Sequence, residues 1–226
     1  MYRHIIHLTV YVLYFTVSAF AQTDPLEKKM IAKGLVDVQK IDPSIAVELK
    51  YSTTDNFIKT DVYGNLTRAY LQPMAAQKLA KASKLLQAIN PDYHLLIYDA
   101  ARPMSVTVIF WNKMSHLPPH LREDFVADPK QGSIHNFGCA IDLTIADQNG
   151  KALDMGTPFD YYGDLAWPTK EQYLFKIGKL TKAQITNRKL LRKVMVDAGY
   201  TSIVSEWWHF NALSRKQAKV RYGFID

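Results

Sequence analysis

The residues with the clearest capacity for chemistry lie within positions 133–144. His135 and Asp142 are seven residues apart there, with Gly138 between them. Asp142 stands in an apolar segment whose alternation is typical of a buried strand. Because a glycine lets the backbone turn sharply, the loop can bring the imidazole of His135 and the carboxylate of Asp142 to one point, where a cation can bind.

A second carboxylate and imidazole, Glu206 and His209, lie far downstream beside two tryptophans. Catalytic zinc takes three protein ligands and leaves a fourth position for water. The pattern therefore indicates His135, Asp142 and His209 as the ligands of one zinc ion.

Glu206 is predicted to act beside this ion without binding it. On an ideal strand Glu206 and His209 point to opposite faces, so a bulge or a turn at Glu206 is required to aim both inward. With that turn, Glu206 can take a proton from water and pass it to a leaving amine. The alternative is a surface glutamate in an ion pair.

Two further residues are candidates for the site. Arg102 follows a short apolar segment, at a predicted strand-to-helix junction. Its guanidinium suits a carboxylate or a developing oxyanion, or it pairs with Asp99 to hold the junction. Ser133 either donates to a substrate or caps the turn. Asp99 and Asp160 are interpreted as supporting residues.

The elements that must position these residues form a mixed order along the chain. We expect strands at 36–40, 45–51, 94–98 and 139–144, and helices at 73–89, 103–114 and 182–198. Residues 203–204 and 207–210 are predicted to form either two short strands or one bulged strand. Residues 115–132 show no periodicity and are predicted to form a loop. The fold class is α+β: a single domain with a mixed, mostly antiparallel sheet, flanking helices and a zinc site.

The chain has 226 residues, of which 48% are hydrophobic and 22% charged, an ordinary globular composition. Residues 1–21 have the pattern of a signal peptide, with Arg3, an apolar run over 5–17 and an Ala-Phe-Ala cleavage site. The alternative is an uncleaved membrane anchor. We expect residues 22–226 to form the domain of an exported, periplasmic protein (secreted if the host lacks an outer membrane), with no stable membrane insertion after cleavage.

Cysteine content and charge exclude some classes of function. Cys139 is the single cysteine, so no intrachain disulfide can form, and its strand position favours a small buried residue over a nucleophile. The formal net charge is +7, but the basic residues are scattered and no nucleic-acid motif is present. The pattern does not indicate an oligomeric state.

Two motifs resemble those of the VanX-type D-alanyl-D-alanine dipeptidases. They are Ser-x-His-x-x-Gly-x-Ala-x-Asp at 133–142 and Glu-Trp-Trp-His at 206–209, supported by similar segments at 51–57, 99–103 and 155–160. The resemblance covers residues 36–213. The zinc motif is shared with related D,D-carboxypeptidases and L,D-endopeptidases, whereas segments 51–57 and 206–209 favour the dipeptidases.

The resemblance implies a zinc metallopeptidase, with one Zn²⁺ per chain, that cleaves the small D,D-dipeptide D-Ala-D-Ala into two D-alanines. It implies that Glu206 is the catalytic base, that Arg102 stabilises the transition state and that Ser133 lines the substrate site, with the zinc ligands as above. Two alternatives are a D,D-carboxypeptidase acting on longer cell-wall peptides and a catalytically inactive wall-binding module.

Overall fold

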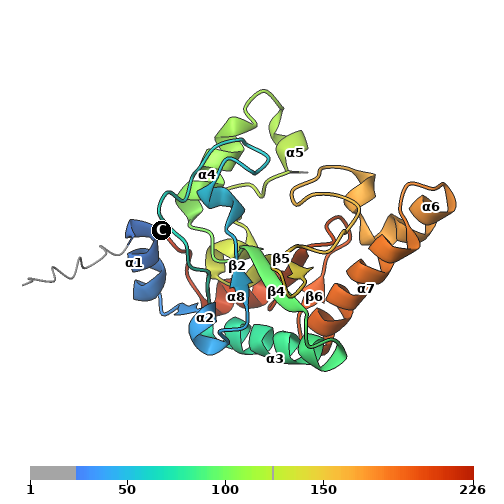
Figure 1. The fold of residues 1–226 in the computed structure, drawn as a ribbon. Coiled ribbons are helices and arrows are strands. Elements are labelled where there is room, and N and C mark those ends of the chain that lie inside the picture. The colour runs from blue at the N-terminus through green and yellow to red at the C-terminus, as the bar shows by residue number, and fades with distance from the viewer. Residues whose placement is uncertain (1–23, 124) are drawn as a thin grey trace, which may run out of the picture.

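The structure, a computed structural model, describes residues 24–123 and 125–226 (Figure 1). The predicted signal peptide, residues 1–21, lies outside the described residues. Within the described ranges, no helix combines the length and the apolar character needed to cross a membrane.

A five-stranded sheet forms the centre of the fold, in the order β2-β4-β5-β7-β6. The β2 strand is parallel to β4, and the other neighbouring pairs are antiparallel. A separate antiparallel pair joins β1 to β3. The strands are β1 Val36–Asp37, β2 Ala46–Val47, β3 Tyr70–Leu71, β4 His94–Asp99, β5 Ala140–Ala146, β6 Thr201–Ser202 and β7 His209–Asn211. The predicted α+β class with a mixed, mostly antiparallel sheet is confirmed.

Helices surround this sheet (Figure 1). Proline at the first turn starts the longest helix, and a capping box starts the next longest, where Thr181 and Gln184 each accept the other's backbone N–H. The α-helices are α1 Pro25–Ala32, α2 Val38–Ile41, α3 Pro73–Ile89, α4 Met104–Lys113, α5 Pro119–Arg122, α6 Glu171–Lys176, α7 Lys182–Asp197 and α8 Arg215–Arg221. Short 3₁₀ helices are η1 Lys50–Ser52, η2 Ile134–Phe137, η3 Asp164–Ala166 and η4 Pro168–Lys170.

The strand β5 is buried on both of its faces. Its residues Leu143 and Ile145 lie opposite Ile97 and Leu95 of β4, in the main core cluster that includes apolar residues of α3 and α7. Successive side chains of a strand alternate between faces, so Asp142 projects from the other face. Figure 1 shows α3 on one side of the strands and α4 and α5 on the opposite side. The sheet therefore separates the side that packs against α3 and α7 from the side that bears Asp142.

Some predicted elements are wrong in extent. The predicted strands 36–40 and 45–51 are each only two residues long, because Asp37 accepts the N–H of Gln39 and caps α2, and because η1 begins at Lys50. The predicted loop 115–132 contains the short helix α5. In the last part of the sheet, the strands are Thr201–Ser202 and His209–Asn211, so the predicted strands 203–204 and 207–210 are misplaced.

Candidate metal centre and active site

Cross-strand pairing brings Asp142 and His209 together. Asp142 of β5 lies directly opposite His209 of β7 in an antiparallel pair, and directly opposed residues project from the same face. The distance between Asp142 Oδ1 and His209 Nδ1 is 2.9 Å. The sheet register, not a local sequence motif, therefore unites these two side chains.

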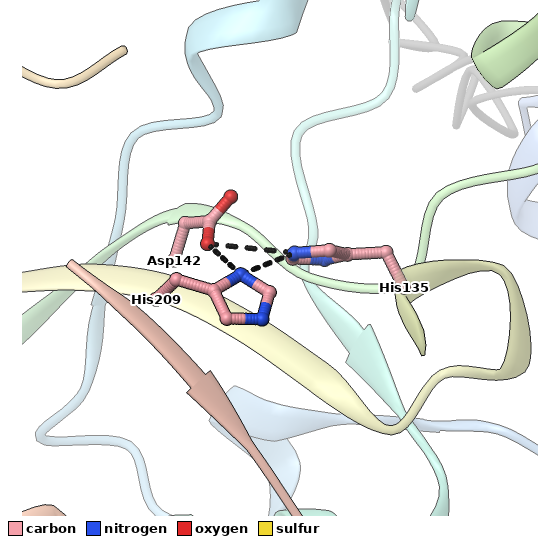
Figure 2. A group of neighbouring side chains, drawn as sticks. All are labelled: His135, Asp142 and His209. Atoms are coloured by element: carbon pink, nitrogen blue, oxygen red, sulfur yellow. Dashed lines mark hydrogen bonds and ion pairs between the residues drawn. The ribbon is translucent and has the colours of Figure 1, made fainter. Parts of the chain in front are cut away.

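His135 reaches the same point from the 3₁₀ helix η2, which precedes β5 (Figure 2). Gly138 ends η2 with a left-handed backbone, φ 66°, and so turns the chain into the strand. His135 Nε2 lies 3.2 Å from His209 Nδ1 and 3.4 Å from Asp142 Oδ1. One ligand atom from each of the three residues lies within 4.8 Å of the others.

The hydrogen bonding of His135 leaves its Nε2 free to bind a metal. His135 is buried, and its Nδ1 lies 2.6 Å from the carbonyl oxygen of Ala100. Since a carbonyl can only accept, Nδ1 carries the hydrogen, and the lone pair of Nε2 faces Asp142 and His209. Two imidazole nitrogens and one carboxylate oxygen converging on one point match the ligand chemistry of a catalytic zinc ion.

Asp142 and His209 shift each other's pKa. Burial opposes the charge of Asp142, but the two neighbouring imidazoles, His135 and His209, hold its pKa well below the usual range. Burial alone would lower the pKa of His209, but the hydrogen bond and the charge of Asp142 raise it to about 9.

Arg102 lies beside the three metal-site residues and is held in place by Asp99. It can therefore pair with Asp99 and still face a developing oxyanion, which were the two roles considered for it. Its Nε donates to Asp99 Oδ2 at 2.9 Å, and its Nη2 lies 3.7 Å from Asp142 Oδ2. Asp99 is fully buried and also accepts from the hydroxyl of Tyr63 at 2.6 Å. Asp99 thus aims the guanidinium into the pocket and offsets its charge, as a supporting residue.

Glu206 lies in the irregular segment between β6 and β7, with bends on either side of it, so the alternation of an ideal strand does not separate it from His209. Its Oε2 is 3.8 Å from His209 Nδ1, and 35% of its side-chain surface is exposed. Burial of the carboxyl, together with the charge of Asp142, raises the pKa of Glu206, although His209 opposes this. A carboxylate with a raised pKa beside the metal ligands is suited to exchanging protons.

Ser133 both caps η2 and lines the pocket. Its Oγ accepts the backbone N–H of His135 at 3.3 Å, and its own N–H donates to Asn136 Oδ1 at 2.6 Å. The cap role and the substrate role considered for Ser133 are therefore compatible with one position.

A pocket of about 850 Å³ contains all six predicted site residues. Its lining also includes Asp160, interpreted from the sequence as a supporting residue, and Tyr51, to which the sequence assigned no individual role. The hydroxyl of Tyr51 donates to Asp160 Oδ2 at 3.0 Å, and Asp160 has a left-handed backbone, φ 59°. Burial and the charge of Asp142 raise the pKa of Asp160 well above its ordinary value. The pair is separated by 109 residues, so spacing alone carried no signal for it.

Comparison with known proteins places the chain in a family. Residues 31–224 match the model of peptidase family M15, described as D-ala-D-ala dipeptidase. A D-alanyl-D-alanine dipeptidase of Escherichia coli is 35% identical over 176 residues, which cover 78% of this chain and 83% of that protein. A D-alanyl-D-alanine dipeptidase of Enterococcus faecalis is 27% identical over 204 residues, covering 84% and 97% of the two chains.

A solved structure of the LdcB LD-carboxypeptidase is similar at 21% identity with a TM-score of 0.41, and the similarity covers 67% of this chain and 63% of that chain. The assignment rests on the family match and on the relatives, which span most of the chain. The protein belongs to the D-Ala-D-Ala dipeptidase family of metallopeptidases.

Proposed function

We propose that this protein hydrolyses D-Ala-D-Ala to two D-alanines with one zinc ion held by His135, Asp142 and His209. One observation carries the proposal: in a member of this family, the three ligand atoms, the carboxylate of Glu206 and the guanidinium of Arg102 share one pocket. A zinc ion bound there supplies a Lewis acid that polarises the scissile carbonyl and acidifies a water molecule.

Glu206 moves the proton in this reaction. Its carboxylate accepts a proton from the attacking water, whose oxygen adds to the carbonyl carbon, and then passes that proton to the leaving amine as the peptide bond breaks. The 3.8 Å contact with His209 keeps Glu206 next to the ligands, and its raised pKa favours both acceptance and release.

Arg102 stabilises the charge that develops on the carbonyl oxygen. Its Nε and Nη2 bind Asp99, and its Nη1 makes no hydrogen bond within the described part of the chain. Free donors of a fixed cation stabilise an oxyanion most effectively when they are positioned in advance. The anchoring to Asp99 supplies this preorganisation.

Asp160 and Ser133 are suited to the two ends of a dipeptide. A free D,D-dipeptide carries an ammonium group at one end and a carboxylate at the other. Asp160 offers a carboxyl group in the pocket, held by Tyr51. Burial and Asp142 disfavour its charged form in the empty pocket, and an ammonium group bound beside it would favour that form by lowering its pKa. Ser133 offers a hydroxyl donor on the lining.

A D,D-carboxypeptidase acting on longer wall peptides is the second candidate, and the size of the pocket favours it. A volume of about 850 Å³ lies in the upper part of the range for pockets that enclose drug-sized ligands, so there is space beyond a dipeptide. An inactive wall-binding module is disfavoured, because the proposed ligands and Glu206 are all present and converge.

The N-terminal pattern supports action outside the cytoplasm. We propose cleavage after Ala21 and a periplasmic location, where the dipeptide arises from turnover of peptidoglycan. The support is the positive residue, the apolar run and the small-residue cleavage site of residues 1–21. Mass spectrometry of the mature protein from a periplasmic extract tests it, since a retained Met1 would contradict cleavage.

The activity is tested by measuring free D-alanine released from D-Ala-D-Ala and from a tripeptide that ends in D-Ala-D-Ala. The zinc-loaded wild type is compared with Glu206→Gln, which keeps the size of the side chain but not its basicity. We expect the wild type to cut the dipeptide and the variant to lose about 10²–10⁴-fold in kcat.

The two substrates separate the candidates. Equal or faster cleavage of the tripeptide would assign the protein to the carboxypeptidases. Zinc binding without cleavage of either peptide would support the binding module. A Glu206→Gln variant with unchanged kcat would remove Glu206 from the mechanism.

A further inference from the structure

Asn211 lies behind His209, on the side of the ring away from the other ligand atoms. Asn211 Oδ1 is 2.9 Å from His209 Nε2, while His209 Nδ1 faces Asp142 and His135. We propose that Asn211 is a positioning residue, which accepts the Nε2 hydrogen of His209 and so presents Nδ1 to the metal. The proposal rests on the proposed zinc site.

The sheet holds Asn211 in place. It is two residues beyond His209 on β7, so both side chains project from the same face. Its backbone pairs with Ala140 of β5 on one side and with Thr201 of β6 on the other, and the hydroxyl of Thr201 donates to its carbonyl oxygen at 3.3 Å. Asn211 is 9% exposed, so few other positions are open to its side chain.

The hydrogen bond between Asn211 and His209 determines which nitrogen of the imidazole faces the metal. An imidazole binds a metal through a nitrogen without hydrogen, so the other nitrogen must carry the hydrogen. A rotation of the ring by 180° would direct carbon atoms at Asp142 and would also break the hydrogen bond to Asn211. The amide oxygen therefore favours both the required tautomer and the required orientation.

The two ligand histidines differ in how they are held. His135 is held by the carbonyl oxygen of Ala100, a backbone atom that no substitution removes. His209 is held by a side chain, which substitution can remove. Substitution of Asn211 can therefore measure how much its hydrogen bond to His209 contributes to metal affinity.

The test compares zinc affinity among three variants, by competition with a chromophoric chelator. Asn211→Leu keeps approximate size but removes the acceptor, and Asn211→Asp keeps an acceptor. Thr201→Val removes the hydroxyl that contacts the Asn211 backbone without touching the ring, and it is the matched control. Thermal unfolding of each metal-free variant shows that the fold is intact.

We expect Asn211→Leu to bind zinc 10–100-fold more weakly, the usual effect of losing such a partner of a metal ligand. Asn211→Asp should bind at least as tightly as wild type, and Thr201→Val should match wild type. If Asn211→Leu does not fold, Asn211→Ala replaces it with the same expectation.

Equal zinc affinity in wild type and a folded Asn211→Leu or Asn211→Ala variant would overturn the proposal. So would equal losses in the leucine and aspartate variants, because shape and not the hydrogen bond would then matter. Zinc affinity is read without substrate. A wild type that binds zinc but leaves D-Ala-D-Ala intact would contradict the proposed function without affecting the assignment of Asn211.

Discussion

The affinity for zinc should depend steeply on pH, because a proton occupies the metal position of His209 in the metal-free protein. Asp142 Oδ1 lies 2.9 Å from His209 Nδ1, and a carboxylate can only accept, so Nδ1 carries a hydrogen. Burial lowers the pKa of His209, but Asp142 raises it to about 9. Zinc must displace this proton to bind at Nδ1.

The magnitude follows from the raised pKa. Below pH 9 the fraction of His209 without this proton falls about tenfold for each pH unit, so zinc should bind about 100-fold more tightly at pH 8 than at pH 6. This is a difference of about 2.7 kcal/mol in binding free energy. The sign is fixed: a higher pH strengthens binding until the pH passes the pKa of His209.

Two assays check this prediction. Competition with a chelator, corrected for the chelator's own protonation, gives the affinity at each pH. Calorimetry at pH 7 in buffers with different ionisation enthalpies counts the protons released, and we expect about one from His209. An affinity that changes by less than threefold between pH 6 and pH 8 would refute this account of the Asp142–His209 contact.

Other predictions concern residues around the site. Asp99→Asn should cost about 3–5 kcal/mol in urea unfolding, since it leaves the buried guanidinium of Arg102 without its main partner, and a loss below 1 kcal/mol would contradict this. Gly138→Ala should cost more than about 1 kcal/mol and weaken zinc binding, because φ is 66° and the added Cβ would come within 2.8 Å of a leucine methyl. Gly64→Ala, with φ 59° and no atom within 4 Å of the added Cβ, is the control that carries backbone strain without the clash. Cys139→Ala should keep its peptidase activity, since burial raises the pKa of the thiol to about 12; loss of activity in a folded variant would indicate a role for the thiol.

Short sequence patterns correctly predicted the starts of two helices and the position of β5. Proline at the first turn of α3 and the Thr181 capping box marked where two helices begin, and both begin there. The apolar alternation after Gly138 marked β5, which the structure extends to Ala146. Each of these signals depends on residues within one or two turns of chain.

Features that depend on distant contacts were not predictable in the same way. The two-residue strands β2 and β6 are too short to show a period, and β2 exists because it pairs with β4. The approach of Tyr51 to Asp160 joins segments with no shared pattern. The three metal-site residues were found by residue type and by resemblance, but their convergence required the register of β5 with β7.

The metal-site residues also have a consequence for how the folded chain holds together. His135 is 74 residues from His209, and Asp142 is 67 residues from it, in a chain with a single cysteine. An ion shared by these side chains would close a long loop, as a disulfide does in many secreted proteins, and it would do so reversibly.

This cross-link ties the C-terminal part of the sheet to its centre. β7 pairs with β5 over three residues and with β6 over two, so the strand pairing in this part of the sheet is short. Free zinc at 100 times its dissociation constant would add about 2.7 kcal/mol to the free energy of unfolding. The free zinc concentration would therefore affect the stability of the fold as well as its chemistry, and we expect zinc removal to make the segment from β6 to α8 more sensitive to proteolysis.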